Sequence, residues 1–346
     1  MRHHSERWNS DESSRRERDT GRAALQLTAR CSFALIWRSS PVRARPVNSS
    51  HHIDRKGLGL GIAAYGLWGI LPIYFKALRA VPSVDIVAHR IVWSVPILAL
   101  LLSVAGAWKE IGIAMRNCRA MLFLLATALL IGGNWLLYVY AVNSGHILAG
   151  SLGYYLNPLA NVLLGRIVLK ERLSWLQWAA VGLAAAGIAA LAAGALGQLW
   201  ISLTLCLSFA SYGLLRKIAP VDAVAGLAIE TTLLAPFAAA WLTWSVTSGQ
   251  PTFGNSSADL VLIAIAGVVT TVPLLLFTAA ARRLPYSTLG MLQFLAPTLQ
   301  FLIAVLLYGE PFTAAHAIAF GAIWAALGLY VTAIVRHARA SVSLPE

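Results

Sequence analysis

Long apolar stretches alternate with short polar segments through most of this 346-residue chain. Ten stretches of roughly 18 to 23 residues carry few charges, and helices of that length, at 1.5 Å per residue, cross a hydrocarbon core of about 30 Å. They cover residues 58–78, 84–104, 120–141, 147–165, 175–195, 198–215, 223–243, 260–280, 286–307 and 313–335. Because lipid offers no water to backbone groups, each should be helical. The pattern predicts an all-α, polytopic membrane protein with ten transmembrane helices.

The basic residues predict the orientation. Of the 27 Lys and Arg, 12 lie in the first 57 residues and 15 follow them, and 12 of those 15 fall in alternate loops. The opposite loops hold only Lys76 and Arg79, with Arg90 just inside the second span. Short basic loops stay in the cytoplasm, so both termini are expected there.

The N-terminal segment differs from the rest. Residues 1–56 are rich in Arg and Ser and contain no apolar run of spanning length, which predicts a disordered basic cytoplasmic extension. Residues 337–346 would be a cytoplasmic tail. The net charge of +13 could suggest nucleic acid, but the basic residues lie in this extension and in orienting loops, so no nucleic-acid partner is predicted.

The spans contain an internal repeat. Pro158 and Glu171 recur 139 residues later as Pro297 and Glu310, and Arg90 has its counterpart 140 residues later at Glu230. The chain therefore divides into five-helix repeats over residues 57–196 and 197–336.

An odd number of spans inverts the second repeat relative to the first. Inverted repeats are a recurring construction of secondary transporters, which expose a central site to each side in turn. Other interpretations stay open: duplication that only built a stable bundle, a channel, a membrane enzyme, or a sensor or assembly subunit that transports nothing.

Glu230 is the main candidate for ion binding. It lies about seven residues into the seventh span, or roughly 10 Å from its cytoplasmic end, and a carboxylate at that depth is costly unless it faces the bundle interior or water. Desolvation disfavours the anion, which suits proton binding near neutral pH. The alternative is a structural hydrogen bond or ion pair with a neighbouring helix.

Arg90 stands at the equivalent depth in the second span. An anionic ligand could bridge the distance between Arg90 and Glu230, with Lys76 as a further counter-charge. Alternatively, Arg90 and Lys76 extend to the outer interface.

Uncharged candidates complete a central cavity. Asn134 follows two glycines and precedes Trp135, and Asn157 and Gln293 lie near prolines in the fourth and ninth spans, where a freed carbonyl can line a cavity. Trp68 is also counted as a candidate binding residue. Hydrogen bonds between helices are the alternative role for the amides.

Two features indicate structural roles. Ser174, just after Glu171, is expected to cap the following helix. The negative charge of Glu171 is expected to interact favourably with the positive end of that helix's dipole. Small residues such as Gly182 and Gly187 in the fifth span are expected to pack helices closely, and that face could support a homodimer.

Several stretches resemble a known family. They include His89-Arg-Ile-Val-Trp-Ser94 and Ser151-Leu-Gly-Tyr-Tyr-Leu-Asn-Pro158, with residues 61–76, 132–135, 211–217, 230–232, 270–273 and 290–297. The chain resembles the RarD proteins of the EamA family, in the drug/metabolite transporter superfamily, over about residues 57–336. The resemblance implies a ten-helix inner-membrane permease of two five-helix repeats that moves a small-molecule solute. The family usually has Glu-Ala where this chain has Ala149-Gly150, so no coupling role carries over to that position.

Enzyme functions are not supported. The chain has no GxSxG elbow, HExxH motif, Walker A loop or clustered Cys/His set, so no cofactor and no metal are predicted. Transport would be driven by a proton or other ion gradient, or by the gradient of the solute itself, and the remaining partners are membrane lipids.

Overall fold

The structure is a computed structural model that describes residues 54–144, 146–192, 197, 199–254, 256–309 and 314–342. Over these residues the regular structure is helical and contains no strand. The helices are α3 (Arg55–Ala77), α4 (Ser83–Ala105), α5 (Trp108–Arg116), α6 (Cys118–Asn143), α7 (Ile147–Ile167), α8 (Trp175–Ala192), α9 (Leu199–Ile218), α10 (Ala223–Thr247), α11 (Ser257–Ala264), α12 (Ala266–Ala281), α13 (Tyr286–Gln293), α14 (Leu295–Leu306) and α15 (Ala314–Val342). Residues 1–53 of the expected extension, and Glu310, lie outside the described residues.

Eight segments in the described part of the chain are long and apolar enough to cross a membrane. They are Arg55–Ala77, Ser83–Ala105, Cys118–Ala141, Leu199–Ile218, Ala223–Thr247, Ser257–Ala281, Tyr286–Leu306 and Ala317–Arg336. The other two predicted spans correspond to α7, which includes Asn157, Asn161 and Arg166, and to α8, whose apolar stretch is the shorter Trp175–Ala189. The all-α, multi-pass membrane architecture is therefore confirmed, with eight spans qualifying by length and composition.

Two of the predicted spans are each divided into two consecutive helices: the span at 260–280 into α11 and α12, and the span at 286–307 into α13 and α14. The break between α13 and α14 falls at Phe294, three residues before Pro297. Proline has no amide hydrogen, so the carbonyl of Gln293, four residues earlier, loses its helical partner at that point. The span is therefore interrupted beside Gln293.

Helix α5 was not predicted, because its charged residues were assigned to a loop. Ile111 and Ala114 turn toward α6 and α10, whereas Lys109 and Glu110 are exposed. This spacing is that of a short amphipathic helix. Gly106 ends the preceding α4 with a left-handed φ of 64°, a conformation that favours glycine.

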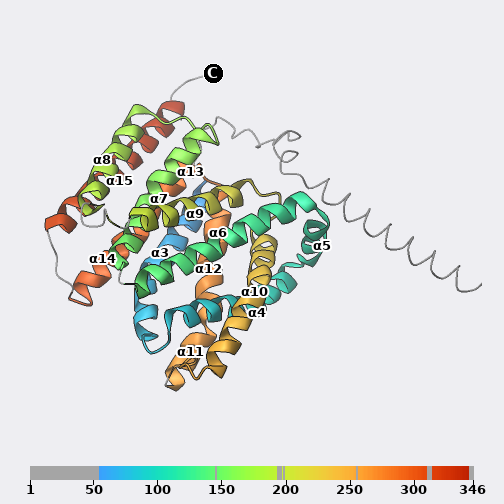
Figure 1. Cartoon of the computed structure of the whole chain (residues 1–346). Coiled ribbons are helices and arrows are strands. Elements are labelled where there is room, and N and C mark those ends of the chain that lie inside the picture. The colour runs from blue at the N-terminus through green and yellow to red at the C-terminus, as the bar shows by residue number, and fades with distance from the viewer. Residues whose placement is uncertain are drawn as a thin grey trace, which may run out of the picture.

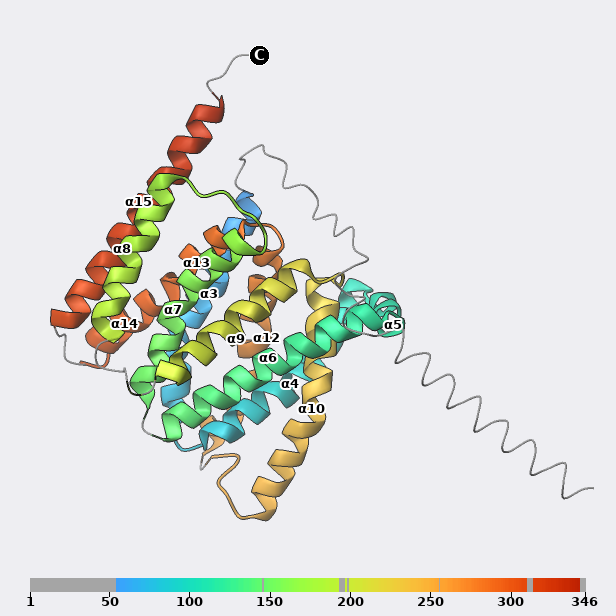
Figure 2. The same cartoon turned by 45° about the horizontal axis from the view of Figure 1, so that its top comes forward.

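The helices pack in pairs across the whole bundle. Helices α8 and α15 lie side by side at one edge in both views (Figures 1 and 2). Helix α7 packs on α9 and α13, α3 on α12 and α14, and α4 on α10 and α12, while α6 packs on α9. The largest apolar cluster is shared by α3, α4, α5, α6, α9, α10, α12, α13 and α14, and a second one by α7, α8, α13 and α15.

Glycines permit the closest of these contacts. A β-carbon at Gly267 of α12 would collide with the carbonyl of Trp93 in α4, and one at Gly187 of α8 would crowd Ala319 of α15. At such crossings two helix backbones approach directly. Gly187 is thus used within the chain, between α8 and α15, and the homodimer stays a prediction.

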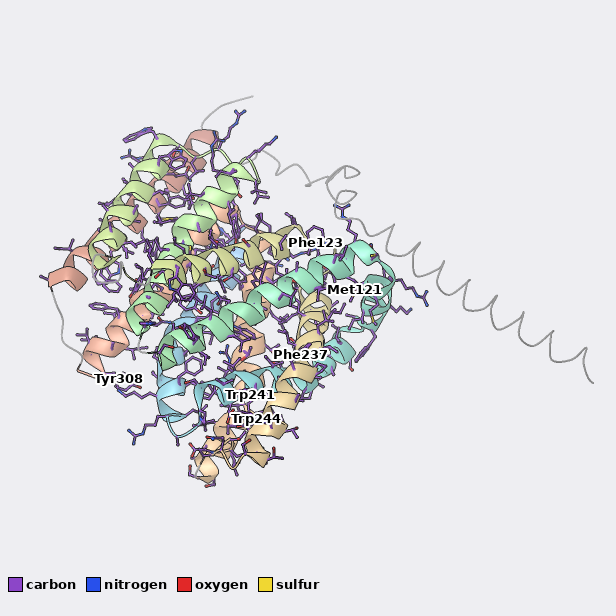
Figure 3. All side chains as sticks on the ribbon, viewed as in Figure 1. Met121, Phe123, Phe237, Trp241, Trp244 and Tyr308 are labelled. Atoms are coloured by element: carbon purple, nitrogen blue, oxygen red, sulfur yellow. The ribbon has the colours of Figure 1, made fainter. Side chains whose placement is uncertain are left out.

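The outer surface is strongly apolar. Phe237, Trp241 and Trp244 project from α10 with 77%, 38% and 56% of their surface exposed (Figure 3). Exposed apolar side chains of this size occur on most of the long helices. In water such a surface would aggregate, so it is the surface that faces lipid.

Candidate functional site

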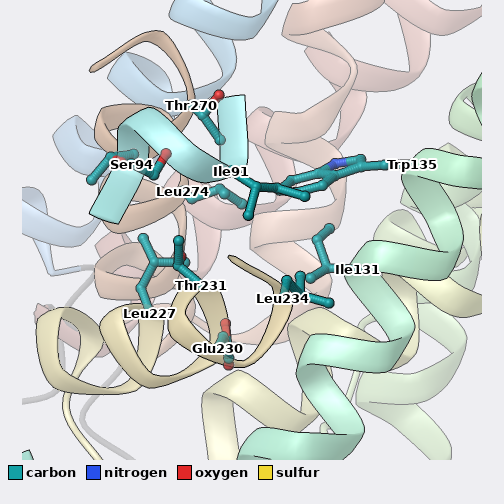
Figure 4. A pocket seen from close by; sticks show the side chains of 11 residues that line it. Ile91, Ser94, Ile131, Trp135, Leu227, Glu230, Thr231, Leu234, Thr270 and Leu274 are labelled. Atoms are coloured by element: carbon teal, nitrogen blue, oxygen red, sulfur yellow. The ribbon is translucent and has the colours of Figure 1, made fainter. Parts of the chain in front are cut away.

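A small pocket lies where α4, α6, α10 and α12 meet. Thr270 and Trp135 lie across it from Glu230 (Figure 4). Its lining residues are Ile91, Ser94, Ile131, Trp135, Leu227, Glu230, Thr231, Leu234, Thr270, Thr271 and Leu274. The cavity volume in which the centre of a water molecule fits is about 10 Å³. The pocket therefore has room for roughly one water molecule.

Glu230 is buried, with 1% of its surface exposed, and its carboxylate has three partners. Arg216 Nη1 lies 3.3 Å from its Oε1. The hydroxyl of Thr127 donates to the same oxygen at 2.5 Å, and the hydroxyl of Tyr212 donates to Oε2 at 3.5 Å. The ion pair with a neighbouring helix, left open as an alternative role, is therefore present, and it joins α6, α9 and α10.

Arg216 is one of the twelve basic residues predicted to lie in cytoplasmic loops, and this prediction is wrong for its side chain. It belongs to the last turn of α9 and is fully buried. Besides Glu230, its Nη2 donates to the carbonyls of Asp222 and Ala223 at 3.4 and 3.1 Å. The apolar run before it allows the long side chain to turn back into the protein, where Glu230 compensates its charge.

Arg90 has a different environment. Its Nε donates to Thr270 Oγ1 at 2.7 Å, and its guanidinium lies over the rings of Trp135 and Phe75, 5.1 and 5.5 Å from their centroids. Among the described residues no carboxylate forms an ion pair with it. Arg90 does not line the pocket itself, but it contacts two residues that do, Thr270 and Trp135.

None of the three candidate amides lines this pocket, and two of them form hydrogen bonds between helices. Asn134 donates to the Leu205 carbonyl and to Ser208, both at 2.9 Å, and accepts from Tyr154 at 3.2 Å, which links α6, α7 and α9. Gln293 accepts from Asn161 at 2.8 Å, which links α13 to α7. These contacts match the interhelical role left open for the amides.

Asn157 is the exception among the amides. It is fully buried on α7, and neither its Oδ1 nor its Nδ2 has a hydrogen-bond partner among the residues that the structure describes. An unpaired buried amide costs about 1–3 kcal/mol. It stays a candidate site residue, separate from the Glu230 pocket.

Trp68 and Lys76 lie away from this pocket. Trp68 of α3 packs in an aromatic cluster with Tyr65, Phe209 and Phe277, at centroid distances of 5.6 to 5.9 Å. The ammonium of Lys76 lies 3.4 Å from the ring centroid of Tyr308, beyond the end of α14. Of the eight candidates, the pocket brings together Glu230 and Trp135, with Arg90 at its edge.

Ala149, where the related family usually has Glu, lies in an apolar environment. It is buried with Ala141, Ile201 and Leu205, and its carbonyl accepts from Ser202 at 2.7 Å. No described side chain of that cluster could compensate a carboxylate.

Glu171 has a structural role, but not on the expected helix. Its carboxylate accepts the amides of Tyr286 and Ser287 at 2.6 and 3.0 Å, and the Ser287 hydroxyl at 2.7 Å, and so caps α13. The Ser174 hydroxyl accepts a hydrogen bond from the backbone N–H of Gln177 at 3.4 Å and so caps the start of α8, as predicted. The two halves of the chain are therefore joined by a cap that local sequence could not show.

Polar contacts close the bundle at the end that carries the basic loops. Lys217 donates to the carbonyls of Ala281 and Leu284, at 2.7 and 2.5 Å. Arg283 pairs with Asp54 at 3.0 Å, and this hydrogen bond lowers the pKa of the Asp54 carboxyl. Arg282 pairs with Asp222 at 3.0 Å. The start of α3, the turn after α9 and the turn after α12 thus lie together.

The opposite end is closed by a second set of contacts. Asp85 accepts from Trp241 at 2.8 Å and from Ser245 at 3.0 Å, and joins α4 to α10. His89 hydrogen bonds with the carbonyl of Thr252 at 3.0 Å. Tyr74 donates to the Leu262 carbonyl at 3.0 Å. These contacts join α4 to α10, α4 to the loop after α10, and α3 to α11.

Known proteins with the same pattern identify the family. The model of the EamA-like transporter family matches residues 55–193. Protein RarD of Escherichia coli (strain K12) is 45% identical, over 80% of this chain and 94% of that protein. An uncharacterized transporter of Vibrio cholerae serotype O1 is 47% identical, over 80% of this chain and 92% of that protein. The chain belongs to the EamA-like transporter family.

A further relative and a solved structure agree with this result. A chloramphenicol-sensitive protein RarD of Pseudomonas aeruginosa is 34% identical to the chain, over 80% of it and 93% of that protein. A protein known from a crystal structure superimposes on this chain with a TM-score of 0.64 and 19% sequence identity. The match covers 80% of this chain and 97% of that chain, and it supports the fold. The chain is therefore a multi-pass membrane protein of the drug/metabolite transporter superfamily. In the described residues, no group of three His, Cys, Asp or Glu is placed to hold a metal.

Proposed function

We propose that this protein is an inner-membrane secondary transporter that moves a small solute by alternating access. Its ten transmembrane segments form two inverted repeats, residues 57–196 and 197–336. The first repeat consists of α3, α4, α6, α7 and α8, and the second of α9, α10, α11 with α12, α13 with α14, and α15.

The pairing of the helices is the observation that carries this proposal. Exchanging each helix for its counterpart in the other repeat turns the α3–α12 contact into α9–α6, and the α3–α14 contact into α9–α7. The pairs α4–α10, α7–α13 and α8–α15 join helices that are each other's counterparts. Such a pattern is expected of two repeats related by a twofold axis in the membrane plane.

The pocket supports alternating access. Two of its helices, α4 and α6, come from the first repeat, and α10 and α12 come from the second. Because it has room for about one water, a solute requires the repeats to separate. Contacts at each end, such as Arg283 with Asp54 and Asp85 with Trp241, would break in turn to open one side.

Glu230 is proposed to couple this movement to protons. A proton on its carboxylate removes the attraction to Arg216 and leaves a buried cation, which favours a rearranged bundle. An alternation of protonated and ion-paired states would link the proton to the conformation, as an antiporter requires.

The test uses everted vesicles that contain the protein, with a metabolite library and chloramphenicol, in the presence and absence of a proton gradient. Wild-type protein is expected to accumulate at least one compound, and Glu230→Gln to lose the gradient-driven part. Glu110→Gln, which neutralises an exposed carboxylate of α5, is the control and should transport normally. Wild-type accumulation by Glu230→Gln would refute the coupling role, and flux of no compound would favour a membrane sensor or assembly subunit.

A further inference from the structure

Arg90 is a partly buried cation that forms no ion pair with any carboxylate of the described residues. An arginine in the bilayer region is costly, so it is retained where it contacts water, a partner or a ligand. Acidic side chains on α4 and α10, two of the helices that line the pocket, are engaged elsewhere. Glu230 pairs with Arg216, and Asp85 accepts from Trp241 and Ser245.

The groups around Arg90 are aromatic and hydroxylic rather than anionic. Phe75 and Trp135 offer ring faces, and the neighbouring titratable side chains are the tyrosines Tyr74, Tyr138 and Tyr154. Its single side-chain hydrogen bond in the described part of the chain uses Nε and Thr270. The outer edge of the guanidinium, which binds oxyanions in a forked arrangement, is left for another partner.

The pocket next to Arg90 is mostly apolar. Ile91, Leu234 and Leu274 line it with the indole of Trp135, the same ring that lies against Arg90. A molecule that enters when the repeats separate would thus meet a cationic fork at one edge and apolar surface beyond it.

We propose that Arg90 binds an oxyanion, a carboxylate or a phosphate, on a solute whose apolar body lies against Trp135. Lys76 takes no part, since it lies over Tyr308. This inference rests on the proposed function, because it takes the pocket as the solute site. It replaces a ligand that bridges Arg90 and Glu230 with one held by Arg90, while Glu230 stays paired with Arg216.

The test measures binding by titration calorimetry to protein in phosphatidylcholine nanodiscs without a gradient. The probes are phenylacetate, phenyl phosphate and the neutral phenylacetamide. Wild-type protein is expected to bind at least one anion about tenfold or more tightly than the amide, the discrimination of a charge-assisted hydrogen bond. Arg90→Gln should lose that preference. Arg90→Lys should keep part of it, because the charge remains without the fork.

Arg79→Gln is the matched control, since it removes an exposed cation from the loop after α3 and should keep the preference. Melting curves verify that each variant is folded. The inference fails if the wild type binds neither anion, if it does not prefer an anion over the amide, or if folded Arg90→Gln keeps the preference. It also fails if phosphatidylglycerol in the nanodiscs abolishes anion binding, since a lipid headgroup would then be the partner.

Failure of the transport proposal is distinguishable. A protein that binds the anions but moves no compound in vesicles would refute transport and leave the Arg90 site intact. A protein that transports neutral solutes but binds neither anion would refute the Arg90 site and leave the transport proposal intact.

Discussion

Two charges at equivalent positions of the proposed repeats, buried Glu230 and partly buried Arg90, have different environments. Glu230 is compensated by Arg216, Thr127 and Tyr212, whereas Arg90 is held by Thr270 and aromatic rings. The sequence could predict that Glu230 is buried, because it lies within an apolar span. It could not predict that Arg216 is the partner of Glu230. An arginine at the end of a span can either extend into the loop or turn back into the protein, and the sequence does not distinguish the two.

The Arg216–Glu230 pair is expected to be strongly coupled. Arg216→Gln and Glu230→Gln should each lower the free energy of unfolding by about 3–5 kcal/mol, because each leaves the other charge buried and alone. The double variant should lose less than the sum, by about 0.5–3 kcal/mol. The measurement is unfolding of purified protein in detergent, titrated with SDS.

The exposed pair Arg282–Asp222 serves as the comparison. Its side chains are 32% and 65% exposed, so the same cycle should give a coupling energy of about 0–1 kcal/mol. Strictly additive losses for Arg216 and Glu230 would show that the two groups do not stabilise one another.

At the scale of the helix, the predicted boundaries agree closely with the structure. The span expected at 84–104 is α4 (Ser83–Ala105), and the one expected at 223–243 is α10 (Ala223–Thr247). Apolar length fixes these limits directly. Helix α5 was missed because a nine-residue helix with charges on one face lacks that signal. The Glu171 cap on α13 joins residues 115 positions apart, which no local pattern encodes.

Close approach between helices gives a prediction with opposite signs at two glycines. Gly267→Ala places a methyl group against the Trp93 carbonyl and should lower the free energy of unfolding by about 1–3 kcal/mol. Gly66→Ala in α3 meets open space and should be neutral or stabilising by about 0.5–1 kcal/mol, because alanine favours the helix. Thermal unfolding in one detergent measures both. Equal effects would mean that the α4–α12 crossing does not depend on the missing side chain.

At the scale of the whole molecule, the sequence predicted a membrane protein with paired repeats but not the arrangement of its helices. The offset of 139 to 140 residues identifies counterparts, such as Pro158 and Pro297, yet it does not state which helices touch. The contacts α3–α12 and α9–α6 depend on packing between distant segments. The small volume of the pocket could not be predicted either, since it depends on the conformation adopted.

The proposed inverted arrangement makes a prediction about sidedness. The loop at 142–146 and its repeat counterpart at 282–285 should lie on opposite sides, because five spans separate equivalent positions. Reporter fusions at 142–146 and 245–258 should read as external, and fusions at 282–285 as cytoplasmic, in line with the basic pair Arg282 and Arg283. A fusion at 168–174, between α7 and α8, is a further cytoplasmic control. If 142–146 and 282–285 report the same side, the repeats are parallel, and exchange of their conformations could no longer turn the pocket from one face to the other.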